Sequence, residues 1–163
     1  MGFDSQLQRK IMGQFATGVT VITMTNGDET WGMTANAVTS VSLDPPLVLV
    51  CVERENQTHP RLSEAGCFAI NILAAGQKEL SDRFAFAGPK DCSGLDVTTA
   101  VTGAPILPGT LGHVDCRVHQ VVAAGDHDIF LGEIVGGELS GGEPLVFYSG
   151  GYRELAAGEI SGD

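Results

Sequence analysis

A short turn, Asn26-Gly27-Asp28, separates two runs of β-branched and small residues, 18–25 and 29–38. An Asn-Gly turn between two such runs is a strong local signal of a β-hairpin. Further segments of strand character follow, each bounded by glycine, proline or polar turn residues; they are 47–53, 67–73, 111–125, 129–139 and 144–155. About seven strands in a chain with 22 glycines predict a mainly β protein, a β-barrel with short helices.

Two of these strand segments carry a more specific expectation. The run 47–53 is apolar on both faces, which predicts a strand in the centre of the sheet. The segment 144–155 comes last along the chain, and we expect it to close the same sheet.

Three segments have helical character. Residues 4–15 place Leu7 and Ile11 four positions apart, which predicts a short amphipathic helix. Residues 58–65 carry a proline in their first turn, a position that helices tolerate well. Residues 75–86 again pair apolar side chains at a spacing of four, so we expect a further helix there.

The whole chain, 1–163, is expected to form one domain, because no linker, internal repeat or change of composition divides it. We expect its core to span residues 15–153. The polar C-terminal tail, 156–163, is expected to fray.

The charge balance excludes several classes of function. The chain has nine Lys and Arg and 20 Asp and Glu, which gives a net charge of −11. Such a chain lacks the cations that nucleic acid or an anionic membrane surface requires. No run of about 18 apolar residues is present for a membrane span. Residues 1–15 are charged and amphipathic, so we expect no signal peptide there. We therefore expect a cytoplasmic protein.

The four cysteines, Cys51, Cys67, Cys92 and Cys116, form no Cys-x-x-Cys pair and no zinc-type set with histidine. We expect buried free thiols and no metal site. Motifs for P-loop hydrolysis, zinc proteolysis, the nucleophile elbow and the Rossmann fold are also missing from the sequence.

Residues 32–46 are dense in small hydroxyl and amide side chains at the end of a strand and in the following loop. Such residues let a ligand approach the backbone closely while N–H and O–H groups point at it. A flat ligand with polar ring edges, such as an isoalloxazine, would suit this segment. The alternative from residue types alone is a hydrogen-bonded turn between strands rich in threonine.

Two further segments are polar. Residues 53–61 place two arginines beside a helix start, which favours either an anion site or a solvated, capped loop. Residues 125–128, Gly-Asp-His-Asp, favour a polar hairpin turn, because adjacent ligands cannot wrap a tetrahedral metal by themselves.

Taken in order, these segments resemble the short-chain flavin reductase family, the FMN-binding split barrels that serve two-component flavin monooxygenases. The matching segments cover most of the chain and are 15–23, 32–36, 40–48, 68–73, 83–85, 125–127 and 150–152, with Gln77 and Leu80. The most specific match is the small-residue segment that begins at Gly32.

The resemblance implies a site and a partner. It implies flavin contacts at Met33, Thr34, Ala35, Asn36, Ser40, Val41, Ser42, Cys51, Arg54, Asn56, Thr58, Arg83 and Phe84. It implies that His127 and Tyr152 face the nicotinamide dinucleotide. The family's members pair as homodimers, with each flavin site near the interface, and pass reduced flavin to a monooxygenase.

The implied activity is an NAD(P)H:flavin oxidoreductase that reduces FMN or FAD without a catalytic nucleophile or base. The alternative is a non-enzymatic flavin-binding or electron-carrier protein on the same barrel. Many relatives carry arginine where Ser149 stands, before the glycines of the last strand, and this difference favours NADH over NADPH. The acidic segment Glu53-Arg54-Glu55-Asn56 leaves the choice between FMN and FAD open.

Overall fold

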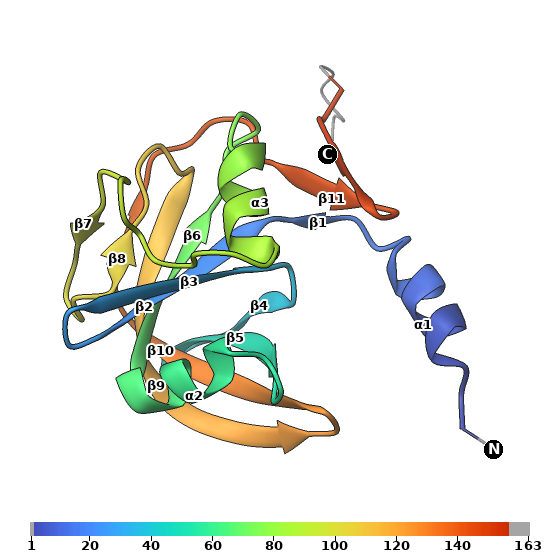
Figure 1. Ribbon diagram of the computed structural model, residues 1–163, viewed down its shortest axis with the longest axis horizontal. Coiled ribbons are helices and arrows are strands. Elements are labelled where there is room, and N and C mark those ends of the chain that lie inside the picture. The colour runs from blue at the N-terminus through green and yellow to red at the C-terminus, as the bar shows by residue number, and fades with distance from the viewer. Residues whose placement is uncertain (1, 157–163) are drawn as a thin grey trace.

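The computed structural model describes residues 2–156, and its main element is a seven-stranded antiparallel sheet that curls around the core (Figure 1). The sheet order is β3-β2-β6-β9-β10-β5-β4. The strands of this sheet are β2 (Thr20–Asn26), β3 (Glu29–Ala35), β4 (Val38–Leu43), β5 (Pro46–Glu53), β6 (Cys67–Ile72), β9 (Gly112–Ala124) and β10 (His127–Leu139). The mainly β fold class is therefore confirmed.

The two edges of this sheet, β3 and β4, are consecutive along the chain. Only Asn36 and Ala37 join them, so the sheet must curl until its two edges approach each other. No backbone pairing between β3 and β4 closes the ring within residues 2–156. The barrel is therefore split at this seam, and Asn36 lies at the point where the two edges meet.

The hairpin expected at residues 26–28 is confirmed. Strands β2 and β3 pair in register from Thr20–Ala35 to Asn26–Glu29, which leaves a two-residue loop. Gly27 takes a φ of 60° at the first loop position, where short hairpin loops favour glycine. The expected central position of residues 47–53 is also borne out, because β5 is paired on both sides, by β4 and by β10.

The expectation that residues 144–155 close the main sheet was wrong. This segment forms β11 (Val146–Tyr148) and β12 (Gly151–Arg153), which pair with β1 (Thr17–Gly18) in a separate three-stranded sheet. Leu145 and Phe147 pack with Phe84 in a second apolar cluster outside the barrel, and this packing holds the segment there. A third, two-stranded sheet consists of β7 (Thr98–Thr99) and β8 (Pro105–Ile106).

All three expected helices are present, with bounds that differ at two of them. They are α1 (Ser5–Met12), α2 (Thr58–Ala65) and α3 (Lys78–Ala85). Helix α3 covers the β3 side of the barrel, and its Phe84 is fully buried. A Cβ at Gly32 would lie 2.5 Å from the Phe84 ring, so glycine at this position lets α3 pack closely. None of the helices in residues 2–156 combines the length and apolar character needed to cross a bilayer.

Helix α1 stands away from the barrel and has no buried residue (Figure 1). Its C-terminal end is fastened to the turn between β11 and β12. The Ser149 N–H donates to the carbonyl of Gly13 at 2.8 Å, and the Tyr148 hydroxyl donates to Gln14 Oε1 at 2.9 Å. Leu7 and Ile11, expected to form an apolar face, are 45% and 54% exposed. The helix is therefore amphipathic but covers nothing in this single chain.

Candidate functional site

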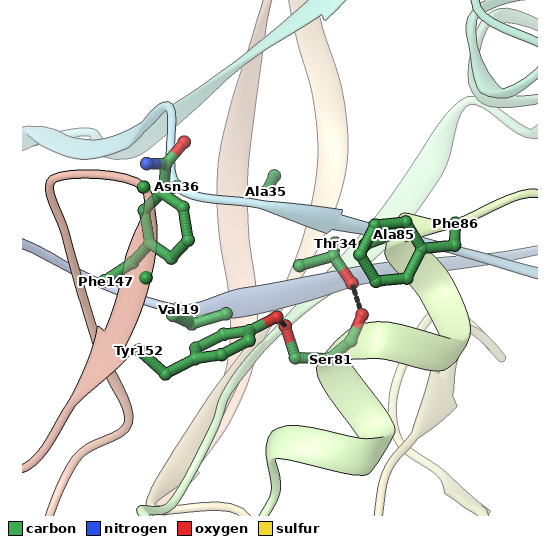
Figure 2. Close-up of a pocket in the computed structure, with 11 residues that line it drawn as sticks. Val19, Thr34, Ala35, Asn36, Ser81, Ala85, Phe86, Phe147 and Tyr152 are labelled. Atoms are coloured by element: carbon green, nitrogen blue, oxygen red, sulfur yellow. Dashed lines mark hydrogen bonds between the residues drawn. The ribbon is translucent and has the colours of Figure 1, made fainter. Parts of the chain in front are cut away.

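A cleft of about 400 Å³ lies beside the barrel seam, between the end of β3, helix α3 and the small sheet (Figure 2). Its walls are mostly apolar, with three aromatic rings. The residues that line it are Val19, Thr34, Ala35, Asn36, Ser81, Ala85, Phe86, Phe147, Gly150, Gly151 and Tyr152. The cleft thus joins three residues expected at the flavin with one expected at the dinucleotide.

Tyr152 connects the small sheet to α3 through its hydroxyl. It donates to Asp82 Oδ1 at 2.9 Å. It also lies 2.8 Å from Ser81 Oγ, which then donates to the tyrosine oxygen (Figure 2). The Thr34 hydroxyl in turn donates to the Ser81 carbonyl at 2.6 Å. These bonds tie β3, α3 and β12 together around the cleft.

Charge around this connection keeps the tyrosine protonated. The hydrogen bond from Lys78, reinforced by that from Tyr152, lowers the pKa of Asp82 below its ordinary value. Burial, together with the neighbouring Asp82 carboxylate, raises the pKa of Tyr152. At neutral pH the tyrosine is thus a neutral donor that faces a carboxylate, and its ring is held against the cleft wall.

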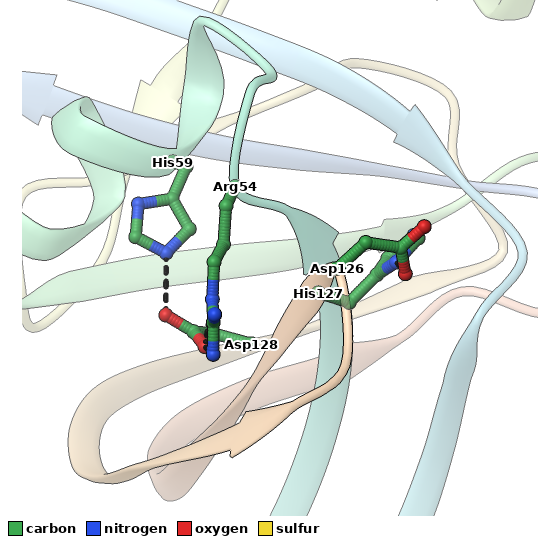
Figure 3. A network of polar contacts seen from close by, with 5 residues as sticks. All are labelled: Arg54, His59, Asp126, His127 and Asp128. Carbon is green, nitrogen blue, oxygen red and sulfur yellow. Dashed lines mark hydrogen bonds and ion pairs between the residues drawn. The ribbon is translucent and has the colours of Figure 1, made fainter.

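A second polar cluster lies at the far end of strands β5 and β10, around Asp128 (Figure 3). Two nitrogens of Arg54 lie 2.8 Å from Asp128 Oδ1, and His59 Nε2 lies 2.8 Å from Oδ2. The hydrogen bond from Arg54, then that from His59, lowers the pKa of Asp128. Arg54 is therefore oriented by a carboxylate 74 positions away in sequence.

The residues between Arg54 and helix α2 mainly serve local structure. Asn56 Oδ1 accepts the Thr58 N–H at 2.9 Å, in a turn directly before α2. The Thr58 side chain is buried, and its hydroxyl accepts from Trp31 Nε1 at 2.9 Å. Arg61, the second arginine of the segment, lies 3.8 Å from the centre of the Trp31 ring. The loop interpretation of this segment has direct structural support.

His127 lies at the β9–β10 hairpin and does not line the cleft (Figure 3). Its Nδ1 is 2.7 Å from Asp126 Oδ1, and that hydrogen bond lowers the pKa of Asp126. The structure thus brings Tyr152, but not His127, to the residues at the end of β3. The role of His127 at the dinucleotide stays a prediction.

The chain matches the family model "Flavin reductase like domain" over residues 12–156. The chain belongs to this family. It is 40% identical over 154 residues to an NADH-dependent FAD reductase of Streptomyces globisporus, covering 91% of this chain and 84% of the relative. It is 42% identical over 155 residues to the FMN reductase (NADH) SmoA of Agrobacterium fabrum, with coverages of 95% and 88%.

A solved structure and a further relative extend this likeness. The flavin reductase PheA2 in its native state aligns with a TM-score of 0.87 and 40% identity, covering 94% of this chain and 99% of that one. The reductase subunit HsaB of a flavin-dependent monooxygenase of Rhodococcus jostii is 35% identical over 93% of this chain and 78% of its own. The expected split-barrel fold and the flavin reductase family are both confirmed.

The remaining flavin-site predictions for this flavin reductase fall into two groups. Ser40, Val41 and Ser42 lie on the edge strand β4, where a register shift between Ser40 and Ser42 leaves Val41 without a partner on β5. Such bulges occur at sheet edges and beside active sites, where they free backbone groups. Cys51 is half-buried on β5.

The residues of the second group have side chains that pack in the core or hold a loop. Met33 packs in the barrel core, and Phe84 packs in the second cluster. Arg83 donates to the carbonyls of Asp91 and Ser93, both at 2.8 Å, and so holds the loop after α3. For these three residues, the side-chain positions in the structure give a packing or loop-holding role.

The sequence argument missed several residues that line the cleft of this flavin reductase, namely Val19, Ser81, Ala85, Phe86 and Phe147. Phe147 precedes the Gly150-Gly151-Tyr152 motif by three positions, so that motif was the available signal. Ser81 lies three positions before Phe84 on the same face of α3, and helical spacing alone could have indicated it.

The residues at the seam fit a planar ring with a polar edge. A volume of about 400 Å³ lies within the range of small-molecule sites. The Asn36 amide, exposed at the cleft, makes no hydrogen bond within residues 2–156. Gly150 and Gly151 let a ligand approach the backbone of the opposite wall. Apolar walls with a few convergent polar groups are what a flavin or nicotinamide ring requires.

Proposed function

We propose that this flavin reductase oxidises NADH, with NADPH as the weaker donor, and reduces FMN or FAD at the seam of the barrel. The observation that carries the proposal is the cleft itself. It places Thr34, Ala35 and Asn36, expected at the flavin, against Tyr152, expected at the dinucleotide. In this proposal the flavin ring and the nicotinamide ring, which must touch, share one cleft.

The protein's contribution is alignment and electrostatics. A bound flavin supplies the ring that accepts the electron pair and the hydrogen of the nicotinamide. Holding two rings in contact is worth effective molarities of about 10⁵ M or more, so no nucleophile or general base is needed. We propose that backbone N–H groups at the β4 bulge around Val41 donate to the ring edge where negative charge develops, because the register shift there leaves Val41 without a partner on β5. Tyr152, held by Ser81 and Asp82, fixes the position of the opposite wall.

The reduced flavin is proposed to leave for a flavin-dependent monooxygenase, as the name of the Rhodococcus relative suggests. We also propose that two copies of the chain pair. Helix α1 exposes its apolar side chains, and Leu43 on the edge strand β4 is 91% exposed. Apolar surfaces of this kind mark interfaces more often than solvent faces. Light scattering behind size-exclusion chromatography tests the pairing, and a monomer mass at micromolar protein would exclude it.

The activity is tested by following NADH absorbance in purified protein with no added flavin, with FMN and with FAD. We expect oxidation only when a flavin is added, and the faster flavin identifies the preferred acceptor. Quenching of flavin fluorescence without NADH or NADPH oxidation would instead indicate a flavin-binding or electron-carrier protein. If the protein neither quenched flavin fluorescence nor oxidised NADH, the proposal would be overturned.

A further inference from the structure

A smaller pocket of about 280 Å³ adjoins the cleft on the side of helix α1. It is lined by Arg9, Lys10, Gly13, Gln14, Ser149 and Gly150. Gly150 lines both spaces, so the turn between β11 and β12 forms a common rim. A single extended ligand that leaves the cleft past Gly150 therefore meets the basic end of α1.

The geometry of this rim is fixed on both sides. Ser149 and Gly150 are the two residues of a tight hairpin loop, and both have positive φ, 49° and 77°. A non-glycine residue in this region is strained, and it persists only where the surroundings hold it. Ser149 is held by its bond to the Gly13 carbonyl at 2.8 Å. The end of α1 is thus positioned against the turn, although the helix itself is exposed.

Arg9 and Lys10 differ from most cations of this acidic chain. Of its nine Lys and Arg, six make ion-pair, carbonyl or aromatic contacts; they are Arg54, Arg61, Lys78, Arg83, Lys90 and Arg153. Within residues 2–156, Arg9, Lys10 and Arg117 make no such contact. Two cations in the last turn of α1 offset the helix dipole, but they also line a pocket that has no acidic side chain.

A further pocket that adjoins the cleft is less suited to an anion. It shares Tyr152 with the cleft and is lined by Lys78 and Arg153, but also by Glu154. Lys78 is already paired with Asp82, and Arg153 donates to the Tyr152 carbonyl at 2.8 Å. The α1 pocket is therefore the better place for a phosphate group beside the cleft.

We propose that the cleft and the α1 pocket form one binding site for a dinucleotide, with a planar ring in the cleft and the diphosphate held by Arg9 and Lys10. The aromatic walls of the cleft suit the ring, and the adjacent cations suit the diphosphate. NADH and FAD share this chemistry. The identification of the ligand as NADH or FAD rests on the proposed function; the diphosphate site at Arg9 and Lys10 does not.

The test uses ADP, which carries a planar base and a diphosphate, and adenosine, which lacks the diphosphate. Calorimetry on the full chain without flavin or NADH measures both. We expect ADP to bind the unmodified protein about tenfold more tightly than adenosine. In the double variant R9Q/K10Q this preference should disappear. Both residues are exposed on α1, so the fold is retained, as circular dichroism verifies.

The variant R117Q is the control for charge removal, because Arg117 lies on β9, lines neither pocket and loses one of the three cations without an ion-pair, carbonyl or aromatic contact within residues 2–156. It should keep the preference for ADP. Equal binding of ADP and adenosine by the unmodified protein would overturn the inference, as would an equal loss in R117Q.

A kinetic arm identifies the source of the diphosphate. With FMN as acceptor, competitive inhibition by ADP against NADH would place the NADH diphosphate at α1. With FAD as acceptor, competitive inhibition by ADP against FAD alone would place the FAD diphosphate there. NADH oxidation with no ADP binding would leave the proposed function intact and overturn this inference. If ADP binding depended on Arg9 and Lys10 but no NADH were oxidised, this inference would stand and the proposed function would be overturned.

Discussion

The hydroxyl of Tyr152 lies 2.8 Å from that of Ser81, and this pair joins the small C-terminal sheet to helix α3. Because Ser81 also accepts the Thr34 hydroxyl through its carbonyl, the bond reaches the end of β3. One residue from each of three elements thus shares a short polar connection at the cleft. The connection therefore joins three walls of the cleft.

Replacing Tyr152 with Phe keeps the ring and removes its hydrogen bonds to Ser81 and Asp82. We expect the KM for NADH to rise about fivefold, because a ring that is no longer held by these bonds should lose about 1 kcal/mol of binding free energy. Flavin affinity, measured by fluorescence quenching, should change little. Ser63→Ala is the control, since it removes a hydroxyl bonded to the His59 carbonyl on α2. An unchanged KM in the Phe variant would separate this connection from dinucleotide binding.

Gly32→Ala should destabilise the protein by about 1–3 kcal/mol, because the new methyl group would overlap a fully buried ring. The nearest Phe84 ring atoms lie 2.5 Å from the position of that Cβ. Urea unfolding measures the change. Gly76→Ala, whose Cβ meets nothing within 4 Å, is the matched control and should be nearly neutral. Equal stability of the two variants would mean that α3 shifts freely against β3.

Asp128→Asn should lower stability at neutral pH and weaken its acid dependence. The hydrogen bonds from Arg54 and His59 hold the pKa of Asp128 below its ordinary value of 3.8. Their contribution is present above that ordinary value and is lost as pH falls through the lowered pKa. The gap in thermal midpoint between the two proteins should therefore be largest near pH 7 and narrow below pH 3.8. A gap independent of pH would contradict the ionic role of Asp128.

Thiol titration should divide the four cysteines into two pairs. Cys92 and Cys116 are buried, and burial raises the pKa of Cys116 to about 12. Cys51 and Cys67 are half-buried, against the expectation of full burial. Cys51 lies on the less covered face of β5, and Cys67 is the first residue of β6. Ellman's reagent should modify two thiols in the native protein and four in urea. Serine at positions 51 and 67 should abolish the native reaction.

Local signals in the sequence were reliable. The hairpin loop at Gly27 and helix α2 were both predictable, since turn glycines, caps and Pro60 act within a few residues of themselves. The resemblance also placed residues 34–36 and Tyr152, which the structure brings to one cleft. The first predictions depended on residues close together in the sequence, and the last depended on several motifs that occur in the same order as in a known family.

Long-range pairings were not predictable in this way. Nothing near Arg54 indicates that Asp128 would orient it, and nothing in residues 144–155 indicates β1 as their partner. Strand pairing depends on which apolar faces pack together, and here Phe147 packs against the cluster around Phe84, outside the barrel. The cleft exists because of that placement, which explains why Phe147 was missed.

The two-residue link between β3 and β4 gives the barrel a covalent hinge where a closed barrel would have a hydrogen-bonded ladder. Widening the seam beside Asn36 therefore breaks no strand-to-strand hydrogen bond between β3 and β4. The link itself is held on its β4 side, where the Ala37 carbonyl accepts the Cys51 N–H at 3.0 Å. For a protein proposed to pass reduced flavin to another enzyme, we expect the ring to leave at this seam, where no hydrogen-bonded ladder stands in its way.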